Sequence, residues 1–169
     1  MHGLLGRSSA IGRSMQHHAE LSACGNYRYA ISRVWDSQLS RVLFICLNPS
    51  TADADLDDPS LRRCIRFAQA WGYGGVVMGN LFAFRATRPR VLSDVQDPIG
   101  PENDRWLTRL RAASEVAVAA WGNRGALQDR ARIVTARPGK LYCLGRTASG
   151  APRHPLYVSG TTQLQNWTV

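Results

Sequence analysis

The chain has 169 residues, of which 44% are hydrophobic, and a formal net charge of +9. This length and composition suit one globular domain with its own core, and no apolar run reaches the roughly 20 residues of a membrane-spanning helix, which excludes a membrane protein. The first twenty residues lack the continuous hydrophobic segment of a secretory signal, so we expect a cytoplasmic protein.

The N-terminal part of the chain shows little periodicity. Residues 1–24 carry Gly, Ser and His without a repeating pattern, which predicts a loosely ordered lead-in with a short helix near Met15 to Ser22. Residues 25–169 are predicted to form a single α/β domain. Its first element, residues 27–35, is aromatic-rich and alternates in part, which indicates an antiparallel edge strand in a hairpin with residues 41–47.

Residues 41–87 predict a strand, a helix and a second strand. The apolar run VLFICL at 42–47 is typical of a buried strand, and it ends at the polar sequence NPST. A second apolar run follows at 76–82. A strand, a polar loop, a helix and a strand in this order form a βαβ unit, whose ligands bind beyond the carboxyl ends of the strands.

The helix between these strands has clear boundaries. Asp58 is suited to cap it, Pro59 fits its first position and Gly72 fits just past its end. Apolar residues recur at helical spacing, namely at Leu61, Cys64, Ile65 and Ala68. One face of the helix is therefore expected to pack on the sheet.

The rest of the chain continues the alternation of helices and strands. We predict a long loop at 85–101, a helix from 101 and a strand at 117–121. A helix of about ten residues after 125, a strand at 141–144 and a turn-rich segment at 145–157 complete the chain. The predicted fold is a three-layer α/β sandwich with a mainly parallel central sheet. The parallel strands end in NPST, RAT, GNRG and GRTASG, which should gather at one edge and form a site.

The positive charge comes almost entirely from arginine, because Lys140 is the only lysine. Arginine suits phosphate through its planar fork, so a nucleic-acid or nucleotide partner is one interpretation. The other is a bias toward arginine codons, since the arginines are spread along the chain.

No cofactor or metal site is predicted. The four cysteines form no CxxC pair, and Cys46 and Cys64 fall at core positions. The acidic run at 53–58 lacks the glycine and glutamate that an EF-hand loop requires. Asp57 and Asp58 remain alternative candidates for a general base.

Two polar residues can be interpreted in two ways each. Asn48 has a donor and an acceptor for holding a water molecule, or it simply ends the strand in a side-chain turn. His154 can stabilise a developing anion, or it is an ordinary surface histidine. No nucleophilic GxSxG, phosphate-binding Walker loop or dinucleotide fingerprint is present, which argues against covalent serine chemistry and NTP hydrolysis.

Four longer segments together resemble an uncharacterised bacterial family, domain of unknown function family 1643. They are FICLNPSTADADLDDPSLRRCIRFAQAWGYGGVVMGNLFAFRAT, DPIGPEND, AAWGNRG and CLGRTASGAPRHPLY. The resemblance runs from about Tyr27 to Tyr157 and implies no established activity.

A more distant resemblance is to the uracil-DNA glycosylase superfamily, and it implies a fold of that type. The motifs that carry it, in chain order, are Leu47-Asn48-Pro49-Ser50, Gly79-Asn80-Leu81-Phe82, Ala120-Trp121-Gly122 and His154-Pro155-Leu156-Tyr157. Ser50 replaces the usual glycine, and a stacking aromatic residue after the first motif is missing.

The superfamily resemblance implies a role for each matched residue. The implied catalytic residues are Asn48, which positions water, and His154, which stabilises the leaving base. The implied base-binding residues are Asn80, Pro49, Ser50 and Tyr157, and the implied phosphate-binding residues are Arg85, Arg146 and Arg153. The expected function is a base-acting hydrolase of the glycosylase type on nucleic acid or a modified nucleotide. The alternatives are a non-catalytic module that binds nucleic acid or a nucleobase, and a nucleotide-modifying enzyme with Asp57 or Asp58 as its base.

Overall fold

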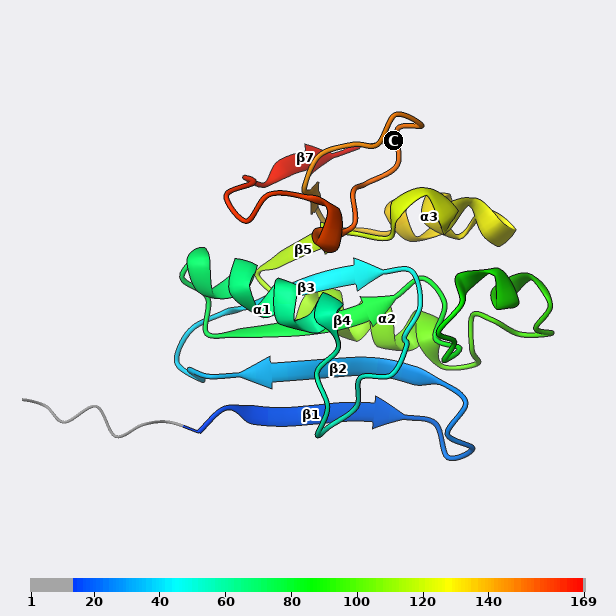
Figure 1. Cartoon of the computed structure of the whole chain (residues 1–169), viewed down its shortest axis with the longest axis horizontal. Helices are drawn as coiled ribbons and strands as arrows, with labels where there is room; N and C mark the ends of the chain where they lie inside the picture. Colours follow the sequence, from blue (N-terminus) through cyan, green and yellow to red (C-terminus); the bar gives the residue numbers. More distant parts are fainter. Residues whose placement is uncertain (1–13, 169) are drawn as a thin grey trace, which may run out of the picture.

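The computed structural model describes residues 14–168, which fold into one seven-stranded sheet with helices packed on it (Figure 1). The strands are β1 Gln16–Leu21, β2 Arg28–Val34, β3 Arg41–Cys46, β4 Gly75–Asn80, β5 Val116–Ala119, β6 Leu141–Cys143 and β7 Gln165–Trp167. The α-helices are α1 Pro59–Ala70, α2 Asn103–Ala112 and α3 Arg130–Thr135. Three 3₁₀ segments are η1 Pro89–Ser93, η2 Gly122–Asp129 and η3 Pro155–Tyr157.

The sheet is parallel at its centre and antiparallel at both sides. Its strand order is β1-β2-β4-β3-β5-β6-β7. The four central strands, β4, β3, β5 and β6, are parallel, whereas β1, β2 and β7 are attached through antiparallel pairs. The prediction of an α/β fold is confirmed, and the parallel part is the predicted series of strands. In the described part of the chain, no helix is both long and apolar enough to span a membrane.

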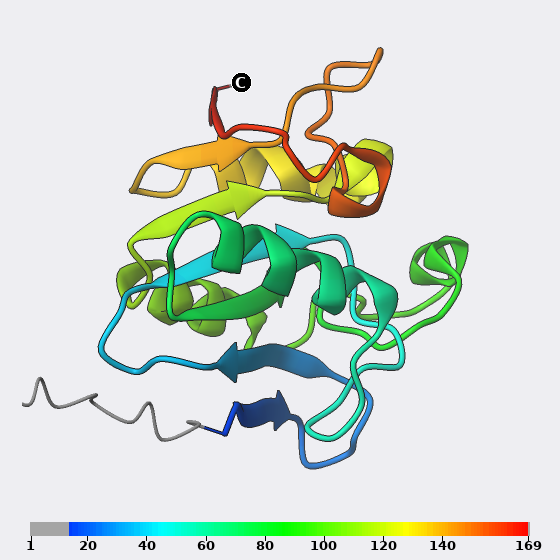
Figure 2. The same cartoon turned by 60° about the vertical axis from the view of Figure 1, so that its left-hand side comes forward.

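Alternate residues of β3 send their side chains to opposite faces of the sheet. Val42 and Phe44 join the core that the apolar face of α1 completes. Leu43 and Ile45 join a second core, to which α2 and α3 contribute. Figures 1 and 2 show α1 on one face and α2 on the other. Helices therefore cover both faces, because both sides of this strand are apolar.

The predicted boundaries of the first helix are confirmed. The Asp58 carboxylate accepts a hydrogen bond from the backbone N of Leu61 at 2.8 Å, and Pro59 is the first helical residue. Gly72 follows the helix with φ of +81°. This left-handed conformation suits glycine, and it turns the chain toward β4.

The prediction for the N-terminal segment is wrong where the structure describes it. Residues 16–21 form β1, which pairs antiparallel with β2, and not a helix; residues 1–13 of the predicted lead-in lie outside the described range. The predicted hairpin of β2 with β3 is also wrong, because β2 pairs with β1 and β4. β2 is an interior strand, and its polar residues Arg28 and Arg33 are buried rather than exposed.

Two predictions in the C-terminal half also need correction. The helix of about ten residues after 125 is instead η2 followed by the six-residue α3. Gln128 and Asp129 have positive φ, and this backbone conformation prevents one continuous helix through η2 and α3. The strand β7 was not expected, and the loop 85–101 contains η1.

Candidate functional site

A cavity of about 500 Å³ lies at the carboxyl ends of the parallel strands. All four polar strand-ending sequences contribute residues to its wall, from the segments that follow β3, β4, β5 and β6. β3 lies between β4 and β5; the chain that leaves β3 passes through α1 on one face of the sheet, whereas the chain that leaves β5 passes through α3 on the other face. This is the point of an α/β sheet at which adjacent loops diverge and ligands bind.

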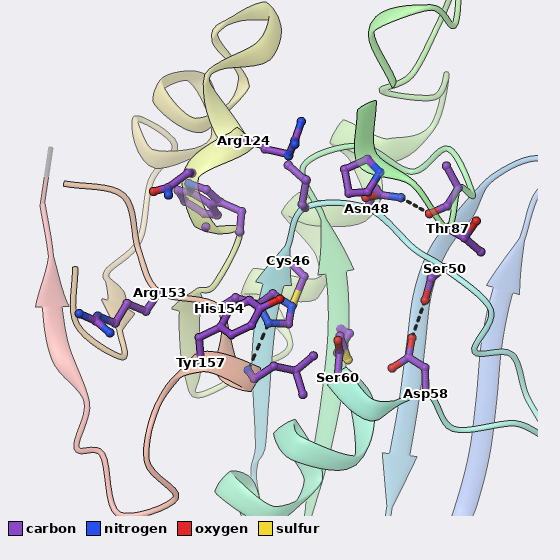
Figure 3. Close-up of a pocket in the computed structure, with 18 of the residues that line it drawn as sticks. Cys46, Asn48, Ser50, Asp58, Ser60, Thr87, Arg124, Arg153, His154 and Tyr157 are labelled. Atoms are coloured by element: carbon purple, nitrogen blue, oxygen red, sulfur yellow. Dashed lines mark hydrogen bonds between the residues drawn. The ribbon is translucent and has the colours of Figure 1, made fainter. Parts of the chain in front are cut away.

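The structure brings together part of the residue set predicted from the sequence. The cavity is lined by six of its members: Asn48, Ser50, Asp58, Arg153, His154 and Tyr157 (Figure 3). Five members do not line it: Pro49, Asn80, Arg85, Arg146 and Asp57. The residues from the β3 loop and those from the final loop therefore form one site.

Asn48 is held by two backbone carbonyls. Its amide Nδ2 donates to the carbonyl oxygen of Pro49 at 3.0 Å and to that of Ala86 at 2.8 Å. The second bond ties the loop after β3 to the loop after β4 (Figure 3). These bonds fix the orientation of the amide and occupy both of its hydrogens, so only the acceptor Oδ1 can act on a ligand or water.

Asp58 lines the cavity while it caps α1. Its Oδ1 accepts from the backbone N of Leu61, and its Oδ2 accepts from the Ser50 hydroxyl at 2.9 Å. The residue is only 9% exposed. The carboxylate that caps the helix therefore also holds the Ser50 hydroxyl at the cavity wall.

Two substitutions of Asp58 separate the contribution of its hydrogen bonds to stability from the contribution of its charge. Asp58→Ala removes both acceptors and should lower the free energy of unfolding by about 1–2 kcal/mol. Asp58→Asn is the matched control, because an asparagine oxygen also caps helices, and it should cost less. Urea unfolding followed by circular dichroism measures both changes; equal losses in the two variants would contradict the capping role.

Asp57 does not line the cavity and pairs with a buried arginine. Its Oδ1 lies 2.7 Å from Nη2 of Arg33 and accepts from Nε at 2.8 Å. The Arg33 side chain is fully buried, and two of its nitrogens also donate to backbone carbonyls. Of the two alternative general bases, only Asp58 is in place to act in this cavity.

His154 presents one ring nitrogen to the backbone of Leu156 and the other toward Cys46, which lines the cavity. Its Nδ1 accepts a hydrogen bond from the backbone N of Leu156 at 3.2 Å, so the neutral ring carries its proton on Nε2. Figure 3 shows the ring next to the sulfur of Cys46. Burial is the largest influence on the pKa of His154 and lowers it, but the hydrogen bond with Cys46 and the charges of Cys46 and Asp58 together raise the pKa above its ordinary value.

The residues that do not line the cavity have other surroundings. Asn80 lies opposite Cys46 in the sheet and is 1% exposed, and neither polar atom of its amide has a hydrogen-bond partner among residues 14–168. Arg85 donates to the carbonyl of Gly25. Arg146 donates to the carbonyl of Thr168 at 2.6 Å and lies over the ring of Trp167, so it holds the C-terminal strand.

Several cavity residues were missed by the sequence reasoning: Arg28, Cys46, Ser60, Asn123, Arg124 and Thr147. Cys46 is the last residue of β3, and the rule that sites lie at strand ends was the signal that could have marked it. Arg28 carried no such signal, because it begins a strand that looked like an exposed edge.

The charges around the cavity favour an anionic ligand. Three arginines line it, Arg28, Arg124 and Arg153, against one carboxylate, that of Asp58. Within residues 14–168, no cluster of three histidine, cysteine or acidic side chains is arranged to hold a metal ion.

Comparison with known proteins identifies the family of the chain. Residues 28–156 match the family described as protein of unknown function DUF1643, and the chain belongs to that family. No curated protein and no solved structure matches the chain.

Proposed function

We propose that this DUF1643 protein is a base-acting hydrolase of the glycosylase type, which binds a nucleotide, free or within nucleic acid, and cleaves its base–sugar bond. The observation that carries the proposal is that Asn48 and His154, far apart in the sequence, line one cavity at the carboxyl edge of the sheet. The three arginines that line the cavity suit the phosphate of such a substrate.

Each side chain has a role that its fixed orientation permits. The Oδ1 of Asn48 accepts a hydrogen bond from water and directs the water's lone pair toward the sugar carbon. The Nε2–H of His154 donates to the departing base as negative charge develops on it. Tyr157 is 78% exposed beside the cavity, and its ring offers a surface on which an unstacked base can lie. The base-reading role expected for Asn80 is not carried over, because its amide does not line the cavity.

One observation favours a second candidate, a non-catalytic module that binds a nucleobase or nucleic acid in the same cavity. Asp58 is the one carboxylate in the cavity wall, and both of its oxygens already accept hydrogen bonds from the protein. A carboxylate held in this way is less available to take a proton from water.

An assay of purified protein on nucleotides and oligonucleotides with modified bases separates the two candidates. A hydrolase releases free base, which chromatography detects, in proportion to time and enzyme concentration. A binding module shows affinity without turnover. In both cases affinity for oligonucleotides should fall as salt is raised, because phosphate contacts release counterions. Affinity that does not change with salt would contradict phosphate binding by the cavity arginines.

A further inference from the structure

Cys46 lies in the wall of the cavity, and its sulfur is close to the side chains of His154 and Cys64. It ends β3 and lines the cavity, with His154 next to it on the cavity side (Figure 3). Cys64 of α1 is completely buried and lies close enough to Cys46 for its side chain to lower the pKa of the Cys46 thiol. A cysteine that served only to fill the core would not need a cavity on one side and two hydrogen-bonding partners.

A buried cation lies near the same sulfur. Arg28 is 1% exposed and lines the cavity, and it donates to the carbonyl of Ala52. Its Nε has no hydrogen-bond partner, and the guanidinium forms no ion pair with a carboxylate, within residues 14–168. An unpaired buried charge is costly, so this guanidinium favours a negative charge in the cavity. The charge of Asp58 supplies part of that compensation, and Cys46 and the anionic group of a ligand are the two further candidates.

We propose that Cys46 is a thiolate nucleophile in this cavity, and that it attacks an electrophilic carbon of a small anionic ligand held by Arg28. Four groups act on the sulfur: Cys64 from α1, His154 from the final loop, Arg28 from β2 and Asp58, which caps α1. The first three favour a negative sulfur, and Asp58 opposes it.

The expected protonation agrees with this geometry. The hydrogen bond from Cys64 is the largest influence on the pKa of Cys46; burial opposes it, but the hydrogen bond and charge of His154 add to it and bring the pKa to about 6. Burial and the neighbouring Cys46 raise the pKa of Cys64, which therefore keeps its proton and remains a donor. Burial lowers the pKa of Arg28 to about 10, so this side chain stays charged at neutral pH.

The covalent step balances without another reactant. A lone pair of the Cys46 sulfur forms a bond to the ligand carbon, and the bond from that carbon to its leaving group breaks. The leaving group departs with the electrons of that bond, as an anion that solvent can protonate. No oxidant or reductant is consumed, and the product is a thioether at Cys46.

Alkylation with iodoacetate and iodoacetamide tests the proposal, because the two reagents differ in charge and both transfer carbon to sulfur with loss of iodide. The rate at each cysteine is measured by peptide mass spectrometry between pH 5 and 9. Reaction at Cys46 should reach half its maximal rate near pH 6, since the thiolate is the reactive form and its fraction rises with pH. The ratio of iodoacetate to iodoacetamide rates should be about tenfold higher at Cys46 than at the exposed Cys24.

Matched variants assign the effect to its causes. Cys64→Ala removes the donor behind the sulfur and should raise the midpoint by about one pH unit or more, whereas Cys64→Ser keeps a hydroxyl donor and should stay closer to wild type. Arg28→Met should abolish the preference for iodoacetate, and Arg28→Lys should keep part of it. The buried Cys143, which does not line the cavity, should stay unmodified in the folded protein.

The wild-type protein alone can overturn the proposal. A Cys46 that stays unmodified below pH 8 while Cys24 reacts, or one with the same reagent ratio as Cys24, would show a sulfur that only fills the core. Both proposals use the Nε2–H of His154, toward the Cys46 sulfur in one and toward the departing base in the other, but their tests differ: alkylation needs no turnover, and Cys64 has no part in the proposed hydrolysis. Either proposal can therefore fail while the other holds.

Discussion

Base release should fall by about 10³-fold or more when Asn48 and His154 are both replaced by alanine. Removal of a single donor that stabilises a developing anion costs about 10²–10³ in rate, and loss of the water-orienting oxygen adds to it. The measurement is the rate of free-base release at saturating substrate, compared with wild type and both single variants. Circular dichroism should show an unchanged fold, because Asn48 and His154 are only partly buried.

The control for this prediction is the substitution of an arginine that lies outside the cavity. Arg146→Ala removes an arginine that holds the C-terminal strand outside the cavity, so it should leave base release nearly unchanged. Base release that survives in the double variant would contradict the assignment of Asn48 and His154. The two single losses should not add fully if the two residues act in the same step.

The largest stability effect is expected at Asp57. Asp57→Ala should lower the free energy of unfolding by about 3 kcal/mol, because it leaves the fully buried Arg33 guanidinium without its only carboxylate partner in the described chain. Urea unfolding measures the change through the transition midpoint at constant slope. A partly exposed ion pair would contribute far less, so the burial of Arg33 decides the size of this effect.

Asp55→Ala is the control for this substitution. Asp55 lies in the same acidic loop and is exposed, so its loss should change stability by less than about 0.5 kcal/mol. A loss at Asp57 as small as that at Asp55 would contradict a stabilising role of the pair with Arg33. Base release by the folded Asp57→Ala protein should be unchanged, since Asp57 does not line the cavity.

The sequence predicted elements well where local and tertiary preferences agree. The run at 42–47 is apolar on both faces, which is the pattern of a strand covered by helices on both sides, and β3 has that environment. Asp58, Pro59 and Gly72 bound α1 through contacts within a few residues. Such contacts depend little on the rest of the fold.

The sequence failed where a partner from a distant segment decides the structure. The aromatic, partly alternating pattern of residues 27–35 predicted an edge strand, but β2 is interior, and its Arg33 is buried because Asp57 and the Asp53 carbonyl supply its hydrogen bonds. A charged residue is buried only when the fold supplies its partner, and the sequence does not show that partner.

The sequence by itself determined the parallel centre of the sheet, the helix capped by Asp58 and the edge at which polar loops gather, because hydrophobic periodicity and capping act over a few residues. Only the tertiary structure decided which side chains share the cavity. It joined Asn48 to His154, left Asn80 outside and placed Cys46 between Cys64 and His154, next to the buried Arg28. The physical reason is that a site depends on distances between segments far apart in the chain, and these distances are set by the packing of the sheet and its helices.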